Sequence, residues 1–193
     1  MLRLTTAVVC CLIALGGCVT TRPPPKASSD WSMRAQILQH ANSWTLNGRA
    51  AVAAGTQGWQ ASLDWRQDDA SSELHLAGPL GIGAQVITQT PSGISINGAA
   101  PSDAALSQLQ DRLGFALPIE ELRFWLLGVP DPGGTFELTR NGQDRAQHLS
   151  QSGWSVDYDR YMAAGGDVLP ARIVLTREDV RVRVVVDHWD MRQ

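Results

Sequence analysis

The sequence predicts a mainly β domain in which about ten antiparallel strands form one curved sheet around an apolar helix. Three features indicate this fold. Several segments alternate apolar and polar residues with a period of two, which is typical of a sheet with one wet face. The links between them are short and rich in Gly, Pro, Asn and Asp, which favours antiparallel neighbours. One helical segment, 118–127, is so apolar that the sheet must cover it.

The folded part begins with a predicted helix over residues 31–40, followed by strands. The helix shows apolar and long side chains at spacings of three and four, namely Trp31, Arg34, Ala35 and Leu38. The clearest strand pattern is 59–66, where Trp59, Ala61, Leu63 and Trp65 share one face. Further strands are predicted at 44–54, 73–76, 83–89 and 93–97, with a turn over 90–92.

Two helices are predicted in the middle of the chain. Ser102 is a suitable N-cap for the first, which carries a leucine stripe and ends at Gly114; the stripe is Leu106, Leu109 and Leu113. Pro118 is suited to the first position of the second helix, which runs to Gly128. Its apolar face comprises Ile119, Leu122, Trp125 and Leu126.

The remaining strands are predicted at 134–139, 145–151, 153–161, 169–176 and 180–189. The last alternates valines, from Val180 to Val186, with Arg181, Arg183 and Asp187. Ten strands in one open sheet curl strongly, so the sheet is expected to wrap around the 118–127 helix.

The N-terminus reads as a removable export signal. Arg3 gives a positive start, and Leu4–Leu15 form an apolar run of about a dozen residues, too short to span a bilayer. The run ends in Leu15-Gly16-Gly17-Cys18, which resembles a bacterial lipobox. We therefore predict a signal peptide over 1–17 and lipid attachment at Cys18; the alternative is an ordinary secretory signal with a chance cysteine.

Residues 18–30 are predicted to tether a single domain, 31–193, to the membrane. Pro23–Pro25 favour an extended chain, and the segment spans roughly 35 Å at about 3.1 Å per residue. In bacterial sorting, Asp directly after the lipidated cysteine retains a lipoprotein at the inner membrane. Val19 occupies that position, so the resemblance implies delivery to the outer membrane.

Composition argues against several function classes. The formal net charge is −3, and Lys and Arg are scattered, so no nucleic-acid partner is expected. Cys10, Cys11 and Cys18 are the only cysteines, which leaves no disulfide or thiol chemistry once the signal is removed. The four histidines, His40, His75, His148 and His188, lack metal-ligand spacing. We predict no metal, no cofactor and no enzymatic activity.

The segment 78–83, Gly-Pro-Leu-Gly-Ile-Gly, combines apolar side chains with residues that resist strand pairing. One interpretation is a tight turn with Leu80 and Ile82 tucked inward. The other is a loop that exposes an apolar tip to a membrane or ligand.

The motifs together resemble the outer-membrane lipoprotein receptor family LolB, over most of residues 31–193. They are Trp44-Thr-Leu-Asn-Gly-Arg49, Gly58-Trp-Gln-Ala-Ser-Leu-Asp-Trp65, Gly78-Pro-Leu-Gly81, Leu117-Pro-Ile-Glu-Glu-Leu-Arg-Phe-Trp-Leu-Leu-Gly128, Gln151-Ser-Gly-Trp-Ser-Val-Asp-Tyr158, Leu169-Pro170 and the closing strand to Trp189.

The resemblance implies a half-open antiparallel β-barrel of ten or eleven strands, with a helical lid over a cavity for lipoprotein acyl chains. LolB-type receptors take lipoproteins from the periplasmic carrier LolA and insert them into the inner leaflet of the outer membrane, without nucleotide. The family's membrane-insertion loop matches Leu80, flanked by Pro79, Gly81 and Ile82. We expect a monomer whose partners are a LolA-type carrier, the acyl chains of cargo lipoproteins and, through its own N-terminal lipid, the outer membrane.

Apolar residues on inward-reading faces are the candidates for lining the cavity: Trp59, Leu63, Trp65, Leu74, Leu76, Ile119, Leu122, Trp125 and Leu126. Plain core packing is the alternative for each tryptophan. Arg49 is either an ordinary surface residue or a contact for a partner or a head group. Two other functions stay open: an acyl-chain sensor of the same fold without insertion activity, and a periplasmic hydrolase, which needs a nucleophile and a base in the cavity.

Overall fold

Ten strands form a single antiparallel sheet in the computed structural model, which describes residues 31–192. The elements are α1 (Trp31–Gln39), β1 (Ser43–Ala54), β2 (Gln57–Asp68), β3 (Ser71–Ala77), the 3-10 turn η1 (Pro79–Gly81), β4 (Gln85–Thr90), β5 (Gly93–Ile96), α2 (Asp103–Leu113), α3 (Ile119–Leu126), β6 (Phe136–Arg140), β7 (Ala146–Gln151), β8 (Trp154–Ala164), β9 (Asp167–Arg177) and β10 (Val180–Met191). The predicted mainly β fold is confirmed.

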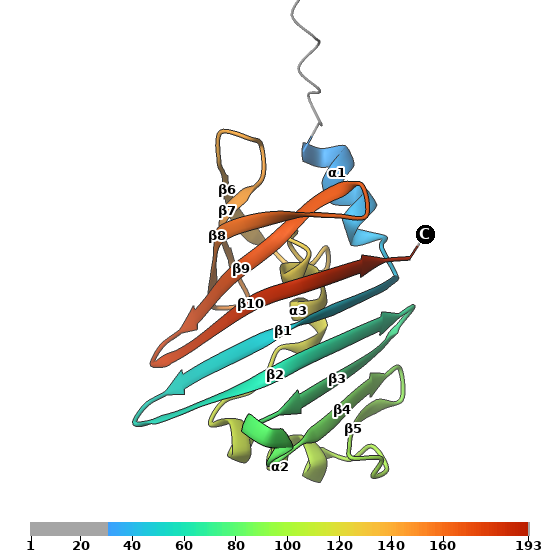
Figure 1. Cartoon of the computed structure of the whole chain (residues 1–193), viewed down its shortest axis with the longest axis vertical. Helices are drawn as coiled ribbons and strands as arrows, with labels where there is room; N and C mark the ends of the chain where they lie inside the picture. The colour runs from blue at the N-terminus through green and yellow to red at the C-terminus, as the bar shows by residue number, and fades with distance from the viewer. Residues whose placement is uncertain (1–30, 193) are drawn as a thin grey trace, which may run out of the picture.

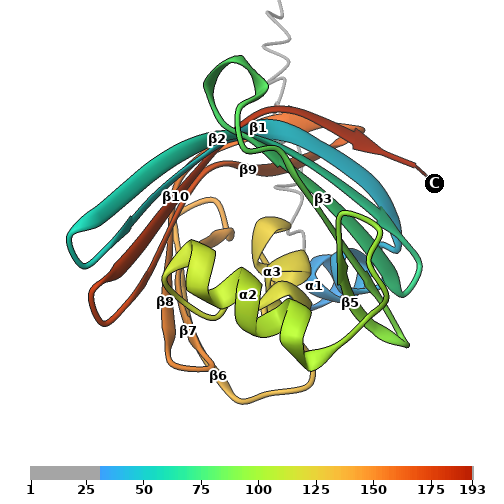
Figure 2. The same ribbon diagram turned by 90° about the horizontal axis from the view of Figure 1, so that it is seen from below.

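The strand order explains why helices cover the sheet. The order is β5-β4-β3-β2-β1-β10-β9-β8-β7-β6, so the two edge strands, β5 and β6, follow one another in the chain. Their connection must cross the open side of the curved sheet, and it carries α2 and α3 (Figure 1). Figure 2 shows the strands arching over these helices, which lie on the concave face. The sheet is a half-open barrel with a helical lid.

The two halves of the sheet join where the first strand pairs with the last. A β-bulge interrupts the β1–β10 register between Asn47 and Gly48. A Cβ atom on Gly48 would lie 2.3 Å from the Val185 carbonyl oxygen, inside van der Waals contact. Only glycine allows the strands to approach this closely.

Aromatic rings pack against one another at one end of the sheet. Trp44 stacks on Trp65 with ring centroids 6.0 Å apart, and meets Trp189 edge-on at 5.4 Å. The indole Nε1 of Trp189 donates a hydrogen bond to the Pro170 carbonyl, 2.9 Å away. Aromatic pairs of this kind contribute about 0.5–1.5 kcal/mol each beyond their buried area, which rigidifies this end of the sheet.

Several predicted boundaries differ from those in the structure. Residues 83 and 84 belong to the loop, so β4 begins at Gln85. Strands β8 and β9 run on to a turn at Gly165–Gly166, because register shifts around Arg160 accommodate Pro170 within the ladder. Pro118 precedes α3 as its N-cap rather than starting the helix, since its ψ of 71° is not helical.

Within residues 31–192, no helix is long and apolar enough to cross a membrane. The predicted signal peptide and Cys18 lie outside the described residues, as does the tether up to residue 30.

Candidate functional site

An apolar pocket lies between the concave face of the sheet and the helical segment. Strands β1–β3, β8, β9 and β10 form one wall, and α2, α3 and their linker form the other. The lining residues are Ala50, Val52, Trp59, Leu63, Trp65, Leu74, Leu76, Leu113, Phe115, Leu117, Pro118, Leu122, Leu126, Trp154, Leu175, Val182 and Val184. All of these side chains are aliphatic or aromatic, so the pocket offers mainly dispersion contacts.

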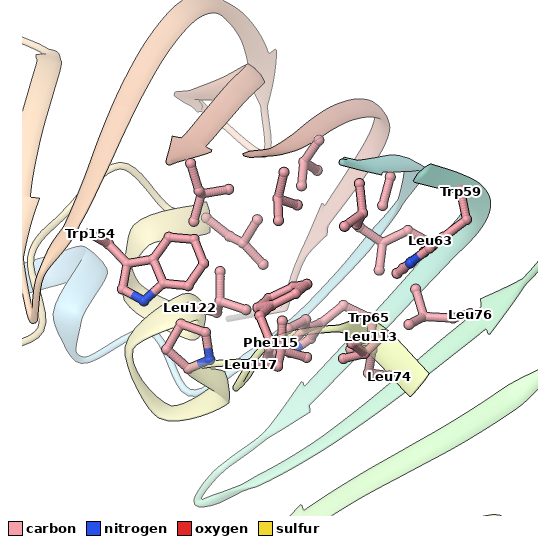
Figure 3. A pocket seen from close by; sticks show the side chains of 17 residues that line it. Trp59, Leu63, Trp65, Leu74, Leu76, Leu113, Phe115, Leu117, Leu122 and Trp154 are labelled. Carbon is pink, nitrogen blue, oxygen red and sulfur yellow. The ribbon is translucent and has the colours of Figure 1, made fainter. Parts of the chain in front are cut away.

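The pocket is elongated and narrow. Figure 3 shows Trp59 and Leu76 at one end and Trp154 at the other, with Phe115 between them. The ring of Trp154 packs edge-on against Phe115, with centroids 5.9 Å apart. The free volume is about 50 Å³.

Seven of the nine predicted cavity residues line this pocket: Trp59, Leu63, Trp65, Leu74, Leu76, Leu122 and Leu126. The other two, Ile119 and Trp125, are buried in the core but do not reach it. The indole Nε1 of Trp125 donates to Oε1 of Gln151 at 2.9 Å, which ties this ring to β7. The helical stripe identified the buried face of α3 but not which part of that face meets the pocket.

Sequence reasoning missed ten of the seventeen lining residues: three in the linker between the helices, Trp154, and six aliphatic residues, Ala50, Val52, Leu113, Leu175, Val182 and Val184. Phe115, Leu117 and Pro118 line the pocket from the α2–α3 linker, and Trp154 does so from β8. The only sequence signal was the apolar run 113–118, Leu-Gly-Phe-Ala-Leu-Pro, which lacks helical periodicity.

The lid is fastened unequally to the two sides of the sheet. On the β7–β8 side, Gln151 and Tyr158 hold α3 through buried hydrogen bonds; the Tyr158 hydroxyl donates to the Trp125 carbonyl at 3.0 Å. On the β4 side, the side chain of Gln89 donates to the Glu120 carboxylate at 3.0 Å in an exposed contact. Buried hydrogen bonds are costlier to break than exposed ones, so α3 is held more firmly on the β7–β8 side than on the β4 side.

Two tyrosines beside α3 stay protonated. Burial raises the pKa of Tyr158 well above its ordinary value, with a smaller contribution from Tyr161. Burial likewise raises the pKa of Tyr161, against a smaller lowering by Arg34 and Arg145. Both hydroxyls donate to backbone carbonyls, Tyr161 to Ala146 at 2.7 Å, so they serve structure rather than proton transfer.

The loop between β3 and β4 projects its apolar side chains into solvent. The side chain of Leu80 is 100 % exposed and that of Ile82 is 73 % exposed. Gly78 closes the loop by donating its N–H to the Ile82 carbonyl at 3.0 Å, and Pro79 and Gly81 shape the 3-10 turn between them. Figure 2 shows this loop standing above the convex face, opposite the helices. The structure therefore has the apolar tip outward, not tucked in.

The backbone holds Leu80 in a strained conformation. Its φ of 59° and ψ of 21° lie in the left-handed region, which costs a residue with a Cβ atom roughly 1–2 kcal/mol. Leucine gains no packing in return, because it is fully exposed. An exposed, strained leucine is typical of a functional contact rather than of a folding requirement.

The polar candidates lie on the outer face of the sheet. Arg49 forms an ion pair with Asp187 at 2.8 Å, with both side chains more than half exposed, so its contribution is about 0–1 kcal/mol. His148 lies between Asp157 at 2.8 Å and Ser150 at 3.2 Å on the side opposite the pocket. Among residues 31–192, no group of three potential metal ligands comes together.

Comparison with known proteins assigns the family. The pattern described as "Outer membrane lipoprotein LolB" matches residues 42–189, most of the chain. The chain belongs to the LolB family. LolB of Nitrosococcus oceani is 34 % identical, with 93 % of this chain and 94 % of that protein covered. LolB of Pseudomonas syringae is 32 % identical, and the match covers 96 % of this chain and 96 % of that protein. LolB of Pseudomonas aeruginosa is 30 % identical, and the match covers 94 % of this chain and 93 % of that protein.

As a member of the LolB family, the protein is an outer-membrane lipoprotein. A crystal structure of a LolA superfamily protein from Nitrosomonas europaea shares the fold, with a TM-score of 0.52 at 12 % identity. The matched region covers 82 % of this chain and 94 % of the Nitrosomonas europaea protein. The predicted LolA/LolB-like architecture is thus confirmed at the level of the fold.

Proposed function

We propose that this LolB-family protein accepts lipoproteins from a LolA-type periplasmic carrier and inserts them into the inner leaflet of the outer membrane. The observation that carries this proposal is the pocket under the lid, whose seventeen lining side chains are all apolar. A site of this composition suits the hydrocarbon tails of a cargo lipoprotein. In the proposed function the protein acts by binding and release of these tails.

The pocket must widen to hold an acyl chain. Its free volume of about 50 Å³ compares with about 10–15 Å³ needed by one water-sized group, so it holds only a few methylenes. A fatty acyl chain contains about a dozen methylenes or more, so the closed pocket is too small for it. The exposed Gln89–Glu120 contact marks the side on which the lid separates from the sheet, while Gln151 keeps the opposite side attached.

The affinity of the pocket must lie between that of the carrier and that of the bilayer. Each methylene buried contributes about 0.8 kcal/mol, so a difference of two methylenes in burial is more than a tenfold preference. A narrow pocket that must open costs conformational free energy, which limits its affinity. Cargo therefore continues into the membrane, where its chains are fully buried.

The proposed anchor is lipid on Cys18, after removal of residues 1–17. Two or more acyl chains give durable attachment, and residues 19–30 permit the domain to stand roughly 35 Å from the surface. The exposed Leu80 loop then provides the second membrane contact, at the moment of delivery.

A transfer assay tests the proposal. The domain from residue 31 onward, which lacks Cys18, is mixed with a LolA carrier loaded with lipoprotein, and the two proteins are separated by affinity tag. We expect the cargo to move to the receptor domain, and then into vesicles when the lipidated full-length protein is used. Cargo that stays on the carrier overturns the proposal, and binding without insertion supports the sensor function instead.

A further inference from the structure

The sheet is incomplete beside one end of the pocket. Strand β3 pairs with β2 only from Ser62 to Asp68, because the chain leaves the sheet after Ala77 to form the exposed loop. Residues 57–61 of β2 pair with β1 along one edge. In the described part of the chain, no strand pairs with their other edge. We call this gap the notch: it is bounded by residues 57–61 of β2, the loop over 78–84 and Leu113 at the end of α2.

The notch is an open hollow of about 340 Å³ that joins the pocket to the loop. Trp59, Leu76 and Leu113 line both the pocket and this hollow, so the two spaces share a wall. These three side chains lie together at the end of the pocket away from Trp154 (Figure 3). The hollow's other lining residues are Gln60, Ala61, Gly78, Ile82, Gly83 and Gln85.

Ile82 stands where the notch meets solvent. It lines the hollow, yet 73 % of its surface is exposed, and its carbonyl accepts the N–H of Gly78 at 3.0 Å. The loop thus fixes an apolar side chain at the outer end of the notch. Leu80, fully exposed, lies two residues before it. Apolar side chains thus mark both ends of the notch, with Trp59, Leu76 and Leu113 at the pocket and Ile82 at the loop.

We infer that cargo acyl chains leave the pocket sideways, through the notch, passing Trp59 and Ile82 to reach the bilayer touched by Leu80. This route rests on the proposed function and specifies how its last step occurs. A chain that follows it contacts apolar side chains at both ends of the notch, which reduces its exposure to water between the pocket and the bilayer. Trp59, half-buried at the shared wall, acts as the gate. Gly78 and Gly83, on the loop side, add no side chains to the notch.

Photocrosslinking tests the route directly. A lipoprotein that carries a diazirine on its acyl chains is transferred from its carrier to the full-length protein, and irradiated with and without phospholipid vesicles. We expect labels at Trp59, Leu76 and Leu113 in the loaded protein, and additional labels at Ile82 once vesicles are present. Labels confined to Leu117 and Trp154 at the other end, with or without vesicles, overturn the route.

A matched pair of variants gives a second, kinetic test. Ile82→Glu places a charge in the route, and Ile37→Glu places the same charge on α1, where Ile37 is 63 % exposed and remote in sequence from the loop. We expect Ile82→Glu to load cargo normally but to release it into vesicles about tenfold more slowly, while Ile37→Glu releases it at the wild-type rate. Trp59→Ala should speed release. Vesicle flotation separates these effects from membrane binding.

The outcomes distinguish the two proposals. If the wild-type protein takes no cargo from the carrier, the proposed function fails whatever the route. If cargo is taken and Ile82→Glu delivers it at the wild-type rate, the function stands and the route is wrong. If the free edge of residues 57–61 instead recruits a strand from the carrier, a peptide of that strand slows loading rather than release, which also overturns the route.

Discussion

Gln151 on β7 binds Trp125 on α3 and the backbone of Asp131 through one buried side chain. Its Oε1 accepts from the indole Nε1 and from the Asp131 N–H, both at 2.9 Å, and its Nε2 donates to the Asp131 carbonyl at 2.8 Å. The residue is only 3 % exposed. Gln151 therefore joins Tyr158 in fastening α3 to the β7–β8 side of the sheet, whereas the Gln89–Glu120 contact on the β4 side is exposed.

Gln151→Leu should lower the free energy of unfolding by about 2–4 kcal/mol, because it leaves the buried Trp125 N–H and the partly buried Asp131 N–H without an acceptor. Urea denaturation measures this change. Gln147→Leu, on the same strand but exposed, is the control and should shift stability by no more than about 0.5 kcal/mol. Equal effects in the two variants would show that Gln151 does not fasten the lid.

Leu80→Glu should leave folding and uptake of cargo from the carrier intact but reduce delivery into liposomes at least about tenfold, since inserting a carboxylate into the interface is unfavourable. Incorporation of radiolabelled lipoprotein into vesicles measures delivery. Leu80→Met keeps the apolar character and should behave as the wild type. Normal delivery by the glutamate variant refutes the membrane role of the loop.

Leu80→Asn should raise the free energy of unfolding by about 0.5–1 kcal/mol, because asparagine tolerates the left-handed region better than leucine does. The same variant should deliver cargo poorly. Urea denaturation together with the liposome assay tests both halves. A loss of stability would mean that Leu80 contributes packing that its full exposure does not show.

Ala50→Leu should reduce loading of acyl chains, because Ala50 lines the pocket and the larger side chain occupies its small free volume. Overpacking costs about 1–3 kcal/mol of stability, so the variant is compared at a temperature where it remains folded. Ala53→Leu, exposed on the same strand, serves as the control. Binding of a fluorescent fatty acid provides the measurement, and unchanged affinity in Ala50→Leu excludes the pocket as the acyl site.

Stability should be independent of tyrosine ionisation below about pH 10 and should fall above it, since unfolding restores an ordinary pKa of about 10. Folding raises both tyrosine pKa values, so the unfolded state loses its protons first. The slope reaches about 1.4 kcal/mol per pH unit for each tyrosine. No lysine or cysteine occurs from residue 31 onward to obscure it. Urea denaturation from pH 7 to 11.5 should show half this slope in Tyr158→Phe; an unchanged slope contradicts the assignment.

Local sequence patterns predicted the strands, the lid helix and the family of this protein. The period-two alternation from Trp59 to Arg66 and in the final valine strand predicted the strands, because successive side chains of a strand point to opposite faces whatever lies around them. The apolar stripe from Ile119 to Leu126 predicted the buried lid helix, because residues three and four apart lie on the same face of a helix. The motifs were specific enough to indicate the LolB family, which the comparisons then confirmed.

Only the tertiary structure decided which buried residues face empty space. Trp125 and Trp154 are equally apolar in sequence, but packing of α3 against β7 turns Trp125 to Gln151 and leaves Trp154 in the pocket. Likewise, 78–83 reads equally well as a tucked turn or an exposed tip, and its outward course follows from where β3 stops pairing with β2. An apolar periodicity is a property of one chain segment, whereas a cavity or a notch depends on how distant segments fail to fill the space between them.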